Sequence, residues 1–147
     1  MKLVLAEPGS KEAGIKVRSL LRGGFSPYTV DLALAEGLNA LWKHVRLHGD
    51  LEAGDARSAV KDLALIYDGL KVLTARELSE EAMDIALNRE ITAYDSLYIA
   101  AARRLKATLY TADRKLYQAS KGVAVAELLK PSARGGQGPM ERDVGRR

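Results

Sequence analysis

Residues 91–122, ITAYDSLYIAAARRLKATLYTADRKLYQASKG, contain the alternation of elements that decides the fold. Apolar residues at helical spacing predict a helix over residues 93–105. The next apolar run, Ala107–Thr111, is short and ends at a turn, which is typical of a buried strand. A second, shorter helix is expected to begin after Asp113. A helix–strand–helix unit of this kind favours a parallel sheet covered by helices.

The same alternation continues towards both ends of the chain. Apolar periodicity predicts further helices around residues 13–21, 34–45, 55–68 and 78–86. Short apolar runs predict strands at residues 25–30, 70–74 and 123–126. Short strands between helices indicate an α/β fold, in which a central parallel sheet lies between two layers of helices. We expect residues 1–130 to form this one domain.

Composition excludes several classes of protein. A chain of 147 residues with 47% apolar and 29% charged residues is typical of one soluble globular domain. It contains no cysteine, which excludes disulfides, thiolate metal sites and a catalytic thiol. No apolar run approaches the roughly 18 residues of a membrane span, so we expect a cytoplasmic protein with no membrane partner. The formal net charge of +4 is compatible with a nucleic-acid partner without arguing for one. Residues 131–147, which contain Gly, Pro and Arg, predict a disordered basic tail.

Three acidic side chains follow predicted strands or begin predicted helices. Asp113 follows the strand that ends at Thr111, and Glu36 lies in the helix after the strand at residues 25–30. Asp95 lies in the first turn of its helix. Because ligands of open parallel sheets bind beyond the carboxyl ends of the strands, these carboxylates are expected to converge on one crevice.

Each of the three acids also has a purely structural explanation. Asp95 fits a capping box with Thr92, and Asp113 is a suitable N-cap for the helix that follows it. Glu36 fits a solvated polar stripe on its helix. His44 and His48 have the spacing of a zinc pair, but they lack a third ligand and are interpreted as rim residues of a helix.

Two motifs in the quoted stretch resemble the PIN-domain ribonucleases, and specifically the VapC-type toxins of VapBC toxin–antitoxin pairs. The family pairs Tyr-Asp-Ala/Ser-x-Tyr at a helix start with Thr-x-Asp-x-x-Leu after the next strand. Here these are residues 94–98 (YDSLY) and 111–116 (TADRKL). Residues 27–39 (PYTVDLALAEGLN) are similar to the family's strand and helix that carry its essential glutamate, here Glu36.

The resemblance implies a ribonuclease that uses Mg²⁺ or Mn²⁺. Glu36, Asp95 and Asp113 would be its catalytic residues and metal ligands, with Thr111 as a supporting hydroxyl. Oxygen ligands suit these hard cations, which activate water to attack a phosphodiester bond. The resemblance further implies an RNA substrate, a homodimer and a cognate VapB-like antitoxin. The basic residues around the Asp113 strand are candidates for RNA contacts: Arg103, Arg104, Arg114 and Lys115.

One part of the family pattern is expected to be absent. Family members begin with an apolar strand that ends in the first catalytic Asp and lies at the centre of a sheet with the order 3-2-1-4-5. Lys2–Ser10 resembles the helix that follows this strand, so we expect the chain to lack the strand and its acid. Either the true start lies upstream, or the protein compensates for the gap in another way. If the chain is complete as given, Glu7 or Asp31 could approach the site, but no sequence pattern favours either.

The expected gap leaves two further hypotheses. In the first, the chain is a catalytically impaired PIN scaffold that binds RNA or a protein partner without cleavage. In the second, it is a structural or interaction protein in which all three acids are helix caps and surface charges.

Overall fold

The computed structural model describes residues 1–8 and 11–129, and the tail predicted over residues 131–147 lies outside these ranges. In the described residues, five strands form one parallel sheet with the order β3-β2-β1-β4-β5. The strands are β1 (Lys2–Leu5), β2 (Ser26–Val30), β3 (Lys71–Leu73), β4 (Thr108–Thr111) and β5 (Ala126–Leu128). The helices are α1 (Lys11–Arg22), α2 (Leu32–Lys43), the π-helical turn η1 (His44–His48), α3 (Ala53–Asp68), α4 (Ala75–Arg89), α5 (Ala93–Leu105) and α6 (Arg114–Ser120).

The prediction of a missing first strand is wrong. Residues Lys2–Leu5 form β1, which lies at the centre of the sheet between β2 and β4. Val4 pairs with Tyr28 of β2 and with Leu109 of β4. The strand is only four residues long and is buried on both faces, so its sequence shows no alternation that separates it from a helix start. The expected strand order is therefore present with its central strand in place.

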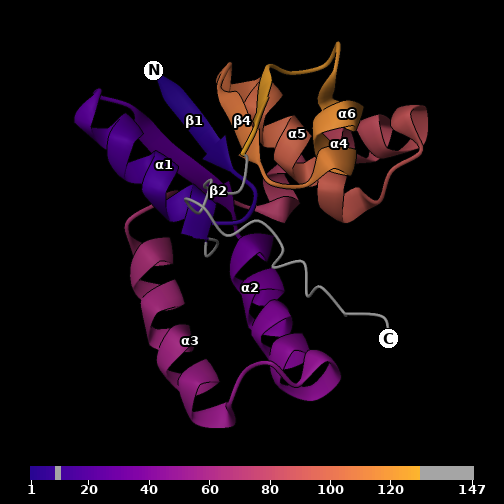
Figure 1. Cartoon of the computed structure of the whole chain (residues 1–147). Helices are drawn as coiled ribbons and strands as arrows, with labels where there is room; N and C mark the ends of the chain where they lie inside the picture. The colour runs from indigo at the N-terminus through magenta and orange to yellow at the C-terminus, as the bar shows by residue number, and fades with distance from the viewer. Residues whose placement is uncertain (9–10, 130–147) are drawn as a thin grey trace, which may run out of the picture.

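The sheet lies between two layers of helices, as the sequence predicts (Figure 1). Side chains alternate across β1: Val4 packs into a core shared with α4, α5 and α6, whereas Leu3 and Leu5 pack into a second core beside α1. Neighbouring β4 repeats the pattern, since Leu109 belongs to the first core and Tyr110 to the second. The α/β class and its three layers are thus confirmed.

One strand boundary differs from the prediction at the end of the domain. The sequence predicts a strand at residues 123–126, but β5 begins only at Ala126. The amides of Val123 and Ala124 both donate to the carbonyl of Ser120, which keeps this segment in the turn after α6. The apolar run therefore includes the turn as well as the start of the strand.

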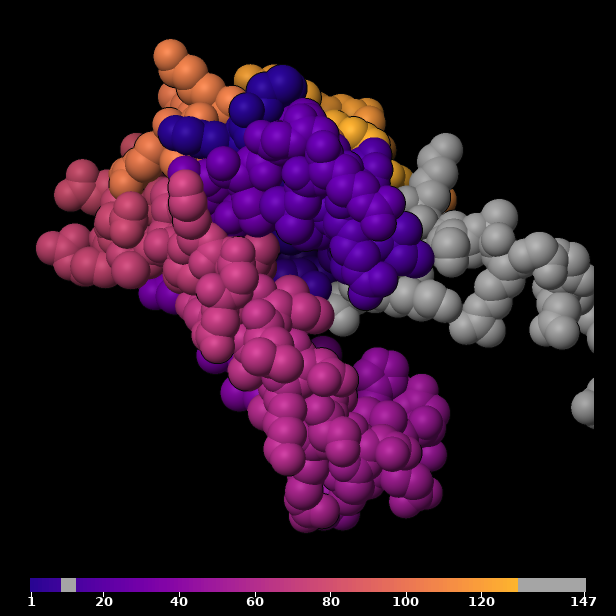
Figure 2. Space-filling view, turned by 90° about the vertical axis from the view of Figure 1, so that its left-hand side faces the viewer, coloured from indigo at the N-terminus to yellow at the C-terminus, as the bar shows by residue number. Residues whose placement is uncertain are grey.

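Helices α2 and α3, joined through η1, project from the body of the molecule (Figures 1 and 2). They approach closely at Gly37 of α2, where an added Cβ would lie 2.6 Å from Cδ2 of Leu63 on α3. Gly37 follows Glu36 directly, so this contact also fixes the backbone that carries the glutamate. Among the described residues, no helix has the length and apolarity needed to cross a membrane.

Candidate active site

Five carboxylates line one cavity of about 630 Å³, and four of them lie around the carboxyl ends of β1 and β4, whereas the fifth, Asp62, belongs to α3. Glu7 follows β1, Asp113 follows β4, Glu36 lies in α2 and Asp95 lies in the first turn of α5. The three acids that the sequence predicted to converge therefore do line one cavity, together with Glu7 and Asp62. Apolar residues of α2 and α3 form much of the remaining wall: Ala33, Gly37, Ala40, Leu41, Ala59, Leu63 and Ile66.

Glu7 is the acid of the cavity that the sequence analysis did not include among its site residues and named only as an alternative to Asp31. Its carboxylate accepts a hydrogen bond from the Ala112 amide at 2.9 Å and one from the Thr111 hydroxyl at 3.1 Å. Burial raises the pKa of Glu7 against these two hydrogen bonds, and the negative charges of Asp113 and Glu36 raise it further. The sequence did contain a signal for Glu7, because it directly follows an apolar run. The rule that ligands bind beyond the carboxyl ends of strands, which selected Asp113, would have selected Glu7 as well.

Thr111 is the buried link between two of the acids. Its hydroxyl donates to Glu7 and accepts from the amide of Asp113 at 3.0 Å. The side chain is fully buried at the end of β4, so this geometry is held by the core of the sheet. The supporting hydroxyl expected from the family resemblance thus contacts both neighbouring acids.

Glu36 contacts a tyrosine of the motif at residues 94–98. The hydroxyl of Tyr98, a buried residue of α5, donates to Oε1 of Glu36 at 2.5 Å. Partial burial raises the pKa of Glu36 despite this hydrogen bond, and the charge of Asp95 adds to the rise. Burial and the contact with Glu36 raise the pKa of Tyr98 far above its ordinary value, so the hydroxyl keeps its proton and acts as a donor.

Asp95 and Asp113 combine a structural role with a place in the cavity. Oδ1 of Asp113 accepts hydrogen bonds from the amides of Lys115 at 2.8 Å and Leu116 at 3.4 Å, which caps α6 as predicted. At the start of α5 the Thr92 hydroxyl accepts from the Asp95 amide at 3.1 Å, which is one half of a capping box. Burial and the charge of Asp113 raise the pKa of Asp95, while a hydrogen bond with Thr92 and the positive charge of Lys115 lower it.

These carboxylates fit a hard divalent cation by their chemistry. They are oxygen ligands, and burial together with the charges of neighbouring acids raises the pKa of Glu7, Glu36 and Asp95. Among the described residues, no three His, Cys, Asp or Glu side chains are grouped closely enough to hold a metal ion by themselves. Mg²⁺ does not need such a group, because it is usually bound by one or two carboxylates together with water and substrate phosphates.

The two histidines lie in η1, in agreement with their interpretation as rim residues of a helix. Both are exposed, and His44 lines the cavity where α2 passes into η1. The Nδ1 atom of His44 lies 2.8 Å from Oδ1 of Asp50, and the rings of His44 and His48 have centroids 5.2 Å apart.

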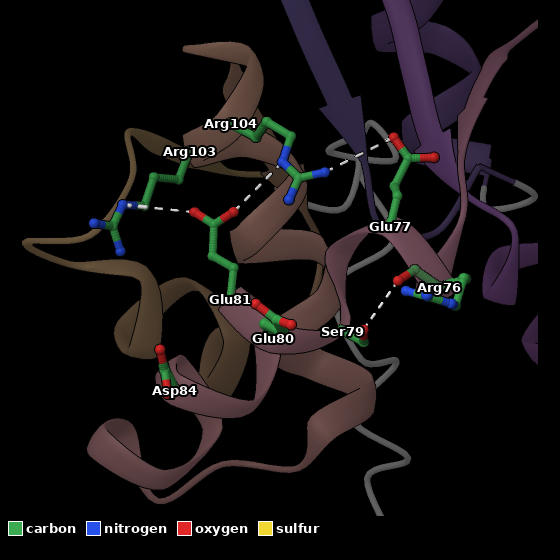
Figure 3. Close-up of a pocket in the computed structure, with 8 residues that line it drawn as sticks. All are labelled: Arg76, Glu77, Ser79, Glu80, Glu81, Asp84, Arg103 and Arg104. Atoms are coloured by element: carbon green, nitrogen blue, oxygen red, sulfur yellow. Dashed lines mark hydrogen bonds and ion pairs between the residues drawn. The ribbon is translucent and has the colours of Figure 1, made fainter.

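Two of the four candidate RNA-binding residues lie away from the acids. Arg103 and Arg104 line a separate groove with α4, where both pair with Glu81 and Arg104 also pairs with Glu77 (Figure 3). Helix α5 carries Arg103 about 12 Å along its axis from Asp95, at 1.5 Å per residue. Arg103 and Arg104 therefore line a different cavity from the one that contains the acids.

The other two candidates, Arg114 and Lys115, are exposed at the start of α6, next to Asp113. Lys115 is close enough for its charge to lower the pKa of Asp95. These are the basic side chains of the predicted set that the structure brings to the acids.

Known proteins resemble the chain over most of its length. The family model described as PIN domain matches residues 4–122. Ribonuclease VapC3 of Pyrobaculum aerophilum is 37% identical over 89 residues, which cover 60% of this chain and 67% of that protein. Exonuclease VapC9 of the same organism is 35% identical over 98 residues, which cover 67% of this chain and 70% of that protein.

Solved structures share the fold. The crystal structure of PAE2754 from Pyrobaculum aerophilum has a TM-score of 0.65 and 28% identity, with 85% of this chain and 87% of that chain covered. A chain of VapBC2 from Rickettsia felis, solved with a DNA fragment from its promoter, has a TM-score of 0.61 and 15% identity. That match covers 88% of this chain and 100% of that chain.

Proposed function

The chain belongs to the PIN-domain family, and on that premise we propose that it is a ribonuclease that hydrolyses RNA phosphodiester bonds as the toxin of a VapBC-type toxin–antitoxin pair. The observation that carries the proposal is the convergence of Glu7, Glu36, Asp95 and Asp113 on one cavity. They lie beyond the carboxyl ends of parallel strands, where open α/β sheets bind their ligands.

Mg²⁺ or Mn²⁺ is the proposed cofactor, held by carboxylates of Glu7, Glu36, Asp95 and Asp113. When bound, such an ion lowers the pKa of the attacking water and offsets the negative charge that develops on the phosphate. The acids themselves repel one another: two carboxylates about 4 Å apart cost roughly 4 kcal/mol at an effective dielectric constant of 20. A divalent cation removes this repulsion.

Glu7 supplies the acid that the sequence prediction lacked. It follows the central strand β1, which is the position of the first acidic residue in the family pattern. Its hydrogen bonds to Thr111 and Ala112 hold it against the turn that leads to Asp113. The hypothesis of a scaffold that does not cleave rested on the absence of this acid, so Glu7 removes its main argument.

The RNA substrate is proposed to enter beside α6. Arg114 and Lys115 are exposed next to Asp113 and offer positive charge to the RNA backbone. Arg103 and Arg104 are left out of this role because their charges are paired with Glu81 and Glu77 of α4.

An antitoxin and a second copy of the chain are the proposed protein partners. Family membership supports both, and the similar solved structures include the VapBC2 assembly. Light scattering on the full chain, alone and with the product of the adjacent gene, tests them: a mass of two chains alone and a larger complex after mixing are expected. A monomer that binds no neighbouring product would contradict both.

The activity is tested with the full chain and a labelled single-stranded RNA, in Mn²⁺ and in EDTA. We expect cleavage in Mn²⁺ that is lost in EDTA and in Asp95→Asn. The control Asp84→Asn changes an exposed aspartate of α4 outside the acidic cavity and should keep the wild-type rate. Equal cleavage by Asp95→Asn and Asp84→Asn would contradict the proposal.

The position of the cut is tested with a circular RNA, because a circle has no end for an exonuclease. An internal cut, as proposed here, linearises the circle in Mn²⁺. An intact circle beside a degraded linear RNA would instead assign exonuclease action.

A further inference from the structure

Tyr98 lines the cavity but is not one of the four acids proposed to hold the metal ion. It lies in α5, is only 2% exposed, and its ring belongs to the core cluster that also contains Val4 and Leu109. Its hydroxyl reaches across the cavity to Oε1 of Glu36 on α2, 62 positions away in the sequence. The body of the protein thus holds a rigid donor against an acid that the projecting helix α2 carries.

Tyr98 is the only residue in the described part of the chain that donates a hydrogen bond to the Glu36 carboxylate. Glu7 accepts two hydrogen bonds from the turn after β4, and Asp113 caps α6. Among the described residues, no Lys or Arg forms an ion pair with Glu36. Glutamate has several rotatable bonds, so a single donor in a fixed position decides where its carboxylate points.

Tyr98 and Asp95 stand three positions apart in α5 and therefore share one face of the helix. Helix α5 thus presents an acid and the donor that orients a second acid towards the same cavity. Because the tyrosine occupies Oε1 of Glu36, Oε2 is left for another partner.

We propose that Tyr98 is a positioning residue, which orients the Glu36 carboxylate for a divalent cation bound between Glu36 and Asp95. This inference rests on the proposed function. Partners that orient metal ligands typically contribute 10- to 100-fold to metal affinity or activity. Tyr98→Phe keeps the buried ring and removes only the hydroxyl, so we expect it to weaken Mn²⁺ binding by about 10- to 100-fold.

A purely structural hydroxyl would act differently. It would change the melting temperature of the metal-free protein and leave the affinity for Mn²⁺ unchanged. Tyr110→Phe supplies the matched control, because Tyr110 is also buried but belongs to the core on the other face of the sheet, where its hydroxyl contacts Glu127.

The experiment measures the melting temperature of the full chain against Mn²⁺ concentration, because the metal-dependent rise reports affinity for the folded state. Wild type, Tyr98→Phe, Tyr110→Phe, Glu36→Gln and the double variant of Tyr98 and Glu36 are compared. We expect the loss of affinity in Tyr98→Phe, wild-type affinity in Tyr110→Phe, and no added loss when Tyr98→Phe is combined with Glu36→Gln.

Wild-type Mn²⁺ affinity in Tyr98→Phe, or an equal loss in Tyr110→Phe, would overturn the inference. So would an added loss in the double variant, because Tyr98 would then act on something other than Glu36. If Glu36→Gln abolishes the Mn²⁺ response, the comparison of Tyr98→Phe with Tyr110→Phe decides. If the wild type itself shows no Mn²⁺-dependent rise, the proposed metal site fails and this inference fails with it. A response in wild type and Tyr98→Phe alike overturns only the role of Tyr98.

Discussion

Thr111 donates a hydrogen bond to Glu7 and so joins the end of β4 to the end of β1, across 104 positions of the sequence. The same hydroxyl accepts from the Asp113 amide, so one buried side chain sets the spacing of two acids. The site is therefore tied to the central strand β1 and to its neighbour β4.

Removing the Thr111 hydroxyl should lower both stability and activity. Thr111→Val keeps the side-chain shape but leaves the Asp113 amide and the Glu7 carboxylate each without one partner, which should reduce the free energy of unfolding by about 1–3 kcal/mol. Thr111→Ser keeps the hydroxyl and should be closer to wild type in RNA cleavage. Urea denaturation measures the change, and a Val variant as stable as wild type would show that these hydrogen bonds contribute nothing.

In the metal-free protein, the acid cluster should make the free energy of unfolding fall as the pH rises. The folded-state pKa of Glu7, Glu36 and Asp95 lies above the ordinary values of 4.5, 4.5 and 3.8. Between the ordinary and the raised pKa, the folded protein binds more protons than the unfolded chain, so the free energy of unfolding falls with increasing pH. We expect Glu7→Gln to reduce this fall in EDTA. Identical pH profiles for the two proteins would refute the raised pKa of Glu7.

Replacement by alanine should change the stability of the protein in opposite directions at Gly37 and at Gly14. A Cβ at Gly37 would lie 2.6 Å from Leu63, whereas nothing lies within 4 Å of a Cβ at Gly14 in α1. Gly14→Ala should stabilise the protein by about 0.5–1 kcal/mol through helix propensity alone. Gly37→Ala should destabilise it by about 1–3 kcal/mol, because α2 and α3 must separate.

Thermal and urea unfolding of the two glycine variants provide the check, and RNA cleavage by Gly37→Ala reports whether Glu36 moves with its neighbour. Equal stabilisation by both substitutions would mean that the contact of Gly37 with Leu63 places no constraint on the two helices.

The two pairs of basic residues should differ in their effect on RNA. Replacing Arg114 and Lys115 by alanine should raise KM for RNA and reduce the dependence of KM on salt, because both cations are exposed beside Asp113. Replacing Arg103 and Arg104, which pair with glutamates of α4, should change KM little. A larger rise in KM on replacing Arg103 and Arg104 than on replacing Arg114 and Lys115 would instead indicate that RNA binds along the groove of Figure 3.

The helices and most of the strands could be predicted from the sequence, but the central strand β1 could not. Helix α5 has the predicted bounds, because its thirteen residues show a clear apolar face. Strand β1 has four residues buried on both faces, so neither length nor alternation identified it. Missing β1 also hid Glu7, since the rule that selects acids after strands applies only once the strand is assigned.

The arrangement of the helices in space explains the remaining differences. Arg103 and Arg104 are near the Asp113 strand in sequence, but at the far end of α5 from Asp95. The contact between Tyr98 and Glu36 depends on how α2 crosses α5, which no single motif encodes. By contrast, Asp113 and Thr111 lie within three positions of each other, so local turn chemistry was enough to relate them.

The central claim is that Glu7 completes an acidic site that cleaves RNA, and the cleavage rate of Glu7→Gln in Mn²⁺ tests it most directly. The substitution keeps the length of the side chain and removes its charge. We expect the cleavage rate to fall at least about 100-fold relative to wild type, which is the loss of rate that a misplaced catalytic group typically causes. The variant should still be folded when it is measured in EDTA. A Glu7→Gln protein that cleaves RNA at the wild-type rate would contradict the account.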